Sequence, residues 1–363
     1  MMIDRRLTRM AGVLIDYSTG VKKGDIVFIK GSSLAEPLIK ELYRLTLERG
    51  GHPHIRVSLP GQSRLYYETA SGEELRYLSP VSLYEARKAD VYISISSASN
   101  TRSLSGIDPA KQAAHGITMK PVSETILRKS RWTITLFPTE AYAQDADMSL
   151  PEFEDFVFKA VFADKSDPVG AWKKLAKMQD ALIKNLRGAD EVRIVSSDTD
   201  LTLSVKGRTF VNSCGKHNMP SGEIFTGPVE NSANGWISFS YPVCYGGREV
   251  DGVRLRFKDG KMIKAEARKN EAFLKSMLGM DRGARYLGEF AFATNRGIQK
   301  FTKSILFDEK LGGTIHLALG RSYPETGGKN KSALHWDMIK DLRKEGEIYV
   351  NGKLFMKKGR FTA

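Results

Sequence analysis

The spacing of apolar residues changes near residue 190, and this change constrains the fold more than any other feature of the sequence. Before it, apolar runs of strand length alternate with segments of helical period; after it, short alternating runs are separated by glycines. The first pattern predicts a mainly parallel sheet, and the second predicts antiparallel pairing. We therefore expect an α/β domain over residues 1–188 and an α+β, largely antiparallel domain over residues 189–363.

The first half has the rhythm of repeated strand–helix–strand units. Serines at 32 and 33 are good helix N-caps, and prolines at 151 and 168 suit the first turn of a helix. The expected helices lie at 4–17, 34–48, 72–88 and 151–186, and the expected strands at 25–30, 53–59, 90–95 and 132–137. The last of these helical stretches would connect the two domains.

The second half is rich in turns. Asp259-Gly260 and Asn351-Gly352 are dipeptides favoured in two-residue hairpin loops. The expected strands lie at 191–196, 201–206, 235–241, 252–257, 262–268, 347–350 and 354–357, with one helix near 270–279. Such a domain would place an antiparallel sheet under whatever site the second half carries.

Composition narrows the class of protein. The 363 residues exceed what a single core usually supports, and the hydrophobic (41%) and charged (27%) fractions are those of a globular chain. No apolar run is long enough to cross a bilayer, and residues 1–6 do not begin a signal peptide, so we expect a cytoplasmic protein without a membrane partner. Cys214 and Cys244 lack the spacing of a zinc finger and are expected to be reduced thiols.

The net charge of +14 raises the question of a polyanionic partner. The basic residues are spread from Arg5 to Arg360 rather than concentrated, which favours a solvated surface over a nucleic-acid groove. Nucleic-acid binding is therefore kept only as an alternative function.

A second alternative is a nucleotide-dependent α/β enzyme that uses the turn from Gly31 to Ser33, where a helix N-terminus could hold a phosphate. The turn lacks both glycine-rich phosphate-binding patterns, which favours an ordinary capped turn. His52 and His54 share a strand face, but no carboxylate or thiol lies near them in sequence, so surface histidines are favoured there. His115, inside a helical pattern, is interpreted as structural.

Two glutamates stand out in the second half. Glu223 follows a loop punctuated by proline and glycine, which would fix its carboxylate rigidly. Glu289 lies at the start of a strand that is otherwise apolar, where an isolated buried charge would cost several kcal/mol unless it were paired or bound to a metal. A glutamate at the surface edge of the strand is the alternative for this position.

Two histidines and an aspartate complete the set. His316 lies within a strand that looks buried, and Tyr323 follows seven residues later. His335 and Asp337 are two residues apart and would share one face of a strand. Carboxylates and imidazoles without thiolates suit Zn²⁺, Co²⁺ or Mn²⁺, and this many ligands indicates a bridged pair of ions roughly 3.5–4 Å apart. The single-zinc HExxH motif is absent.

The chain resembles the M29 metallopeptidases, the aminopeptidase T group, over its whole length. The matching segments occur in family order: STGVKKGDIVFIKG (18–31), MPSGEIFTGP (219–228), LGEFAF (287–292), LFDEK (306–310), HLALGRSY (316–323) and SALHWDM (332–338). In this chain the interval between the LFDEK glutamate and the following histidine is longer than in the family pattern. Trp336 stands where many members have a smaller residue.

The resemblance implies a site and an activity. The metal ligands would be Glu223, Glu289, Glu309, His316, His335 and Asp337. Glu289 would be shared by two divalent ions, zinc or alternatively cobalt or manganese, and Glu223 or Glu289 would carry a proton to the leaving amine. Tyr323 would stabilise the tetrahedral intermediate with its oxyanion, or would complete the metal coordination. The implied protein is a homodimeric two-metal aminopeptidase that removes N-terminal residues from short peptides, with the first domain covering its cleft.

Overall fold

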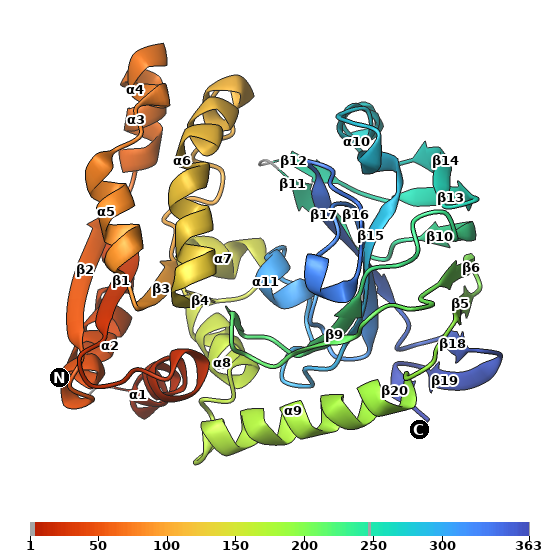
Figure 1. Cartoon of the computed structure of the whole chain (residues 1–363), viewed down its shortest axis with the longest axis horizontal. Helices are drawn as coiled ribbons and strands as arrows, with labels where there is room; N and C mark the ends of the chain where they lie inside the picture. Colours follow the sequence, from red (N-terminus) through yellow and green to blue (C-terminus); the bar gives the residue numbers. More distant parts are fainter. Residues whose placement is uncertain (1–3, 246–247, 363) are drawn as a thin grey trace. The chain divides into compact units, whose positions relative to one another are not determined.

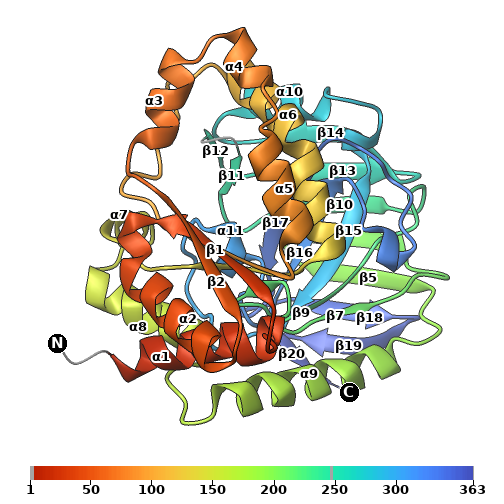
Figure 2. The same ribbon diagram turned by 60° about the vertical axis from the view of Figure 1, so that its left-hand side comes forward.

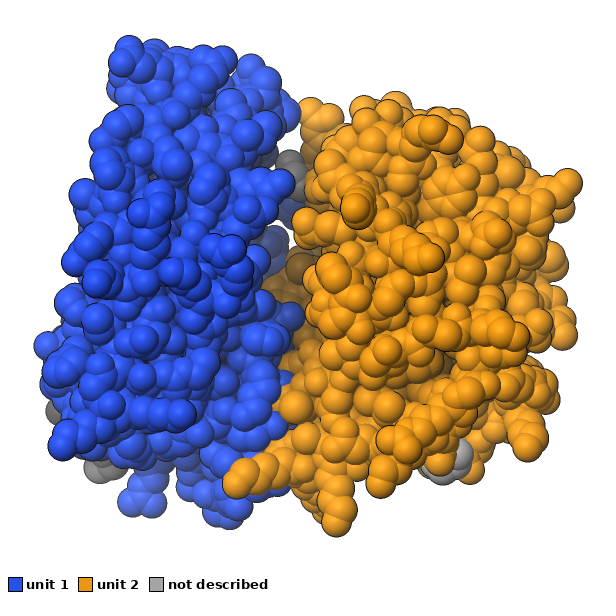
Figure 3. Space-filling view, viewed as in Figure 1, with its two compact units in different colours: residues 1–171, 215–220 blue, residues 172–214, 221–363 orange. Residues whose placement is uncertain are grey.

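The computed structural model describes residues 4–245 and 248–362 of the chain (Figure 1). These residues form two compact units (Figure 3). The first contains the described residues up to Ala171 together with Gly215–Pro220, and the second contains Trp172–Cys214 and the described residues from Ser221 onward. The domain division expected at 188/189, and the role of the first domain as a cover for the cleft, stay predictions.

The first unit is built on a five-stranded parallel sheet, as the sequence predicted. Its strands, in spatial order, are β2 (His52–Ser58), β1 (Ile26–Ser32), β3 (Val91–Ser96), β4 (Arg131–Leu136) and β8 (Asn218–Met219). Val27 and Ile29 on β1 and Val91 and Ile93 on β3 are fully buried, which explains why these two strands lie at the centre of the sheet.

The first unit also contains helices that differ in several places from those expected: the helices Gln62–Thr69 and Glu140–Asp145 were not expected, and the stretch expected at 151–186 is divided into two helices. Their bounds are α1 (Arg5–Gly12), the π-helix η1 (Val13–Thr19), the 3₁₀ helix η2 (Ser33–Ala35), α2 (Glu36–Glu48), α3 (Gln62–Thr69), α4 (Gly72–Arg76), α5 (Pro80–Lys88), α6 (Pro109–Lys129), α7 (Glu140–Asp145) and α8 (Leu150–Ala160). The single helix predicted over 72–88 was wrong: Pro80 cannot extend α4, and Ser79 caps a new helix, α5. The long helix α6, which packs against α5 (Figure 2), contains the helical pattern noted around His115, but its bounds were not assigned in the sequence because Val122 is its only buried residue.

The histidines of the first unit have structural surroundings. His54 stacks on Phe28 with ring centroids 5.1 Å apart, and the Nδ1 of His115 lies 3.1 Å from the hydroxyl of Tyr67. Neither belongs to a group of side chains close enough to hold a metal ion among the described residues.

The second unit is antiparallel, again as predicted. The helix α9 (Pro168–Asn185) leads into it. Its larger sheet has the order β14 (Lys261–Glu266), β13 (Arg254–Lys258), β10 (Asn234–Ser238), β6 (Thr199–Ser204), β5 (Glu191–Ser196), β18 (Glu347–Val350), β19 (Lys353–Lys357) and β20 (Arg360–Phe361). A second sheet has the order β17 (His335–Asp341), β16 (Thr314–Gly320), β15 (Leu287–Ala293), β9 (Glu223–Thr226) and β7 (Val211–Ser213).

The two sheets share one hydrophobic core. Its buried side chains include Ile194 and Leu203 from the larger sheet and Phe290, Phe292 and Leu317 from the smaller one. The remaining elements are the hairpin β11 (Val243–Tyr245) and β12 (Arg248–Val250), α10 (Glu271–Leu278), η3 (Gly283–Arg285), α11 (Ile305–Asp308) and η4 (Pro324–Thr326). Within the described part of the chain, every helix is too short or too polar to cross a membrane.

Candidate metal centre

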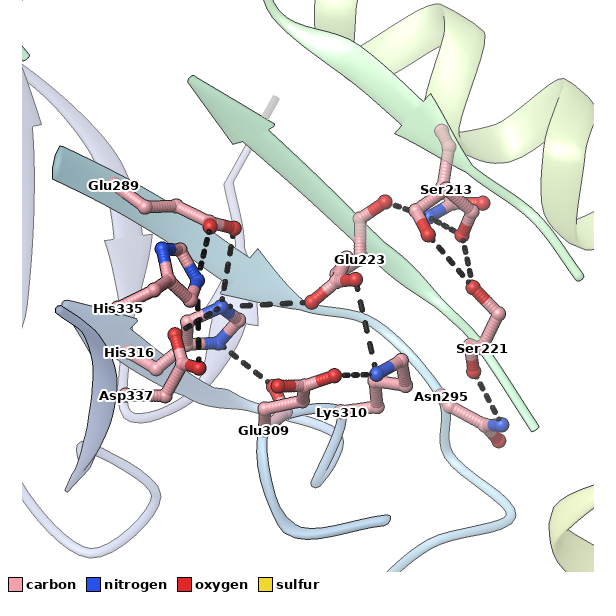
Figure 4. Close-up of polar contacts among 11 residues, drawn as sticks. Ser213, Ser221, Glu223, Glu289, Asn295, Glu309, Lys310, His316, His335 and Asp337 are labelled. Atoms are coloured by element: carbon pink, nitrogen blue, oxygen red, sulfur yellow. Dashed lines mark hydrogen bonds and ion pairs between the residues drawn. The ribbon is translucent and has the colours of Figure 1, made fainter. Parts of the chain in front are cut away.

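Five of the residues that the sequence singled out lie on one face of the smaller sheet (Figure 4). The register in which the strands pair places these residues on the same face. Glu289 on β15 pairs with Ala318 on β16, and Ala318 pairs with Asp337 on β17. Residues directly opposite one another in neighbouring strands project to the same face. The same rule places His335 opposite Gly320, two residues from Ala318 along β16.

The alternation of side chains along each strand places the other two residues on the same face. His316 is two residues before Ala318 on β16, so it shares the face of Ala318. Glu223, the first residue of β9, pairs with Ala293, which is four residues beyond Glu289 on β15. The loop expected around Glu223 therefore ends one residue earlier, at Gly222.

The side chains between these polar residues are small. On the site face, Ala291 lies opposite His316, Ala293 opposite Glu223, and Ala318 between Glu289 and Asp337. On the other face of the same strands, phenylalanine and leucine fill the core. The alternation of large apolar and small or ligand-type residues therefore separates a packed face from a face with room for ions.

Glu289 is placed between the two histidines. Its Oε1 lies 3.4 Å from Nε2 of His316, and its Oε2 lies 3.4 Å from Nε2 of His335. His316 Nε2 also lies 3.5 Å from Oε2 of Glu223 and 4.0 Å from Oδ1 of Asp337. One carboxylate thus faces both imidazoles, and the shared role that the family resemblance implies for Glu289 stays a prediction.

Both imidazoles present the nitrogen that a metal would need. The Nδ1 of His316 lies 2.9 Å from the backbone oxygen of Glu309, and the Nδ1 of His335 lies 2.8 Å from that of Arg321. A carbonyl oxygen can only accept, so each Nδ1–H donates, and in the neutral ring each Nε2 carries the lone pair. Each Nε2 therefore faces carboxylate oxygens, which are also acceptors, so a positive charge, either a proton on Nε2 or a metal cation, must lie between them.

The carboxylates fit the same interpretation. Glu223 Oε2 and Asp337 Oδ1 are buried and accept no hydrogen bond from the described residues. Burial raises the pKa of Glu289, and the nearby carboxylates of Asp337 and Glu223 raise it further. Burial lowers the pKa of His316, but the surrounding carboxylates outweigh this effect and raise it above its ordinary value. Buried carboxylates this close together need positive charge, so the residues fit one or more divalent ions.

Three overlapping groups of side chains have ligand atoms within 4.8 Å of one another in the described residues. They are Glu223–Glu289–His316, Glu289–His335–Asp337 and Glu309–His316–Asp337. All six metal ligands implied by the family resemblance are thus brought together, although their roles stay predictions.

Glu223 is held by groups that the sequence did not mark. The Nε2 of Gln179, fully buried on α9, donates to the backbone oxygen of Glu223 over 2.5 Å. The Nδ2 of Asn295 donates to the backbone oxygen of Ser221 over 2.8 Å. Gly222 has φ +116°, and a Cβ there would lie 2.6 Å from Cβ of Asn295, so only glycine fits this position. The backbone before Glu223 is therefore tightly constrained.

Lys310 is the group at this site that sequence reasoning overlooked. Its side chain is fully buried, its ammonium forms an ion pair with Glu309, and its Nζ lies 3.8 Å from Oε1 of Glu223. Burial lowers the pKa of Lys310, while the charges of Glu223, Asp337 and Glu289 act in the opposite direction. The signal in the sequence was its position directly after the candidate ligand Glu309.

Tyr323 lies beside the cluster. Its ring meets that of His335 edge to face at 5.1 Å and that of Phe225 at 5.5 Å. Burial raises the pKa of its hydroxyl, and the charges of Glu289 and Asp337 raise it further, so the hydroxyl stays protonated at neutral pH and can donate a hydrogen bond.

A cavity of about 170 Å³ adjoins the cluster on the side of His335 and Asp337. Its other lining residues are mostly apolar: Pro242, Val243, Cys244, Tyr245, Phe301, Lys303, Ile305, Asp308, Trp336 and Ile339. Trp336, which stands where many family members have a smaller residue, is buried and packs near Tyr245 and Phe273.

Comparison with known proteins identifies the family. The model of the thermophilic metalloprotease (M29) family matches residues 3–361. The chain belongs to this family. Aminopeptidase T of Thermus thermophilus is 26% identical to this M29 chain, with 99% of the chain and 98% of the relative covered. Aminopeptidase 2 of Geobacillus stearothermophilus is 25% identical, with 93% and 92% covered.

Solved structures agree on the fold. Wild-type AmpT from Thermus thermophilus superimposes with a TM-score of 0.88 at 24% identity over the whole of both chains. A 2,5-dihydroxypyridine dioxygenase from Pseudomonas putida KT2440 matches with a TM-score of 0.59 at 14% identity, over 100% of this chain and 99% of that one. Membership of the M29 family makes this protein a metal-dependent peptide hydrolase, and the nucleic-acid and nucleotide alternatives are set aside.

Proposed function

We propose that this protein is a two-metal aminopeptidase that removes the first residue from short peptides. The observation that carries the proposal is the arrangement of the two imidazoles, whose Nδ1 atoms face backbone carbonyls while both Nε2 atoms face Glu289. The named aminopeptidases among its relatives support the same activity. A cytoplasmic location and a homodimeric state stay predictions.

The six ligand-type side chains would be divided between two ions. Glu223 and His316 would serve one, His335 and Asp337 the other, and Glu289 would bridge them because each of its oxygens faces a different imidazole. Glu309 would add a further oxygen. Bound divalent ions would polarise the scissile carbonyl and lower the pKa of a water molecule to about 7. Zinc is the first candidate, with cobalt or manganese as alternatives.

The remaining steps would depend on side chains. A carboxylate, Glu223 or Glu289, would carry a proton to the leaving amine, since these two are the most buried carboxylates of the cluster. The hydroxyl of Tyr323 would donate to the developing oxyanion, because its raised pKa keeps it protonated. The charged cluster would attract the free α-amino group of a peptide and so restrict cleavage to the first residue.

The cavity beside His335 and Asp337 would receive the side chain of that first residue. Its volume of about 170 Å³ is close to that of an apolar cavity that binds benzene, about 150 Å³. A lining that includes Val243, Phe301 and Ile305 favours leucine, methionine or phenylalanine over charged residues.

Hydrolysis of a panel of aminoacyl-p-nitroanilides by the zinc-loaded protein tests the proposal. Leucyl, methionyl and phenylalanyl substrates should be cleaved, and N-acetylleucyl-p-nitroanilide should be cleaved at least about a hundredfold more slowly because it lacks the charged amine. A chelator should abolish activity and zinc should restore it. Equal rates on the free and acetylated substrates would exclude an aminopeptidase, and activity insensitive to the chelator would exclude the metal site.

A further inference from the structure

Lys310 places a positive charge where the proposed metal ions would bind. Its side chain has no exposed surface, and its ammonium contacts Glu309 and lies 3.8 Å from Glu223. Both carboxylates belong to the groups that could hold an ion. A lysine in this position is unusual because buried charges are costly, and an ammonium within a cation site repels the cations that the site is expected to bind.

The charges of the cluster show what this ammonium does. Glu223, Glu289, Glu309 and Asp337 carry four negative charges when ionised, and two divalent ions would balance them without a lysine. With Lys310 present, an incoming ion must share Glu309 and Glu223 with the ammonium. The effect is greatest for the ion that Glu223 and His316 would serve, since Lys310 pairs with Glu309, which lies near His316, and its Nζ is 3.8 Å from Glu223.

We propose that Lys310 is a built-in competitor for the metal cluster, which weakens the binding of one of the two ions by holding Glu309. The inference rests on the proposed two-metal function. The two ions would then bind with unequal affinities, and one of them would exchange readily with the solution. In the metal-free protein the same ammonium would hold Glu309 and Glu223 near their ligand positions.

Lys310→Met tests this, because methionine has a similar length and no charge. The probe is Zn²⁺, titrated into chelator-treated protein in competition with a zinc-binding dye. The more weakly bound zinc should bind at least about tenfold tighter in Lys310→Met than in the wild type, since a charge within about 4 Å of the ligand atoms is removed. Lys310→Arg, which keeps the charge, should show no such gain.

Lys340→Met is the matched control. Lys340 is also a buried lysine of this unit, but its ammonium pairs with Asp198, which belongs to none of the three metal-binding groups. This variant should bind zinc as the wild type does. A general effect of removing a buried lysine would tighten or weaken zinc binding in both variants and would overturn the inference.

The outcomes separate this inference from the proposed function. Zinc affinity in Lys310→Met equal to or below that of the wild type would overturn the role of Lys310 and leave the two-metal site intact. Absence of zinc binding in every variant would overturn both. If metal-free Lys310→Met does not fold, protein folded with zinc is compared instead: zinc release to a chelator should be at least about tenfold slower than in the wild type, and an equal or faster release would contradict the proposal.

Discussion

The two faces of strands β15 and β16 differ in the side chains that they carry. One face buries Phe290, Phe292 and Leu317 in a core shared with the larger sheet. The other presents Glu289 and His316 beside alanines, next to oxygens of Glu223 and Asp337 that are buried and accept no hydrogen bond from the described residues. Because side chains alternate along a strand, the packed face can hold the backbone rigid while the opposite face keeps charges that destabilise the metal-free fold.

The largest effect is expected on the charged face. Glu289→Gln keeps the size of the side chain but removes the charge shared between the two histidines. We expect kcat/KM on leucyl-p-nitroanilide to fall by about a thousandfold or more, by analogy with the loss of other groups that stabilise a transition state. The metal-free variant should unfold at the same or higher denaturant concentration, since a buried charge is gone. A variant as active as the wild type would show that this face is not the active site.

The packed face should respond in the opposite way. Phe290→Ala leaves a cavity in the shared core and should lower the free energy of unfolding by about 3–5 kcal/mol. Its zinc content per folded chain should stay at the wild-type value, because the side chain points away from the site. Denaturant unfolding and elemental analysis of the folded fraction check this. Loss of metal with unchanged stability would contradict the separation of the two faces.

A substitution of Tyr323 tests whether a side chain outside the sheet takes part in the reaction at the charged face. Tyr323→Phe removes the hydroxyl but keeps the ring contacts with His335 and Phe225. We expect kcat to fall about 10- to 100-fold with little change in KM, since the hydrogen bond would form only in the transition state. A change confined to KM would instead place the hydroxyl in substrate binding.

The smallest effect is expected at an acidic residue whose carboxylate already has an ion-pair partner. Asp341 lies on β17, four residues beyond Asp337, and forms an ion pair with Arg343 and accepts a hydrogen bond from Tyr241. Burial alone would raise the pKa of Asp341, but Arg343 lowers it below its ordinary value. Its contribution to stability is therefore present above the unfolded-state pKa and is lost as the pH falls through the folded-state pKa. Asp341→Asn should lower the free energy of unfolding at pH 7 by about 1–2 kcal/mol. It should also reduce the loss of stability at acidic pH, which denaturant titrations at several pH values measure. An unchanged loss of stability at acidic pH would contradict this role of Asp341.

The sequence predicted the fold class and the meeting of the ligand-type residues for a physical reason. A carboxylate such as Glu289 in an apolar strand is costly and therefore conspicuous, and strand alternation reveals shared faces such as that of His335 and Asp337. The burial of Lys310 against Glu223 and the contacts of Gln179 and Asn295 were missed because they depend on the packing of distant segments. The extent of helix α6 was missed, although a helical pattern was noted around His115, because the helix buries so little that its apolar pattern is weak.

The most direct test of the central claim measures zinc and activity on the same samples. Zinc-loaded wild-type protein, after removal of free metal, should contain up to two zinc ions per chain, and its rate of leucyl-p-nitroanilide hydrolysis should rise and fall with that content. His316→Ala, which removes an imidazole that faces Glu223, Glu289 and Asp337, should lose both zinc and activity while remaining folded. Full zinc content and activity in His316→Ala would contradict the account.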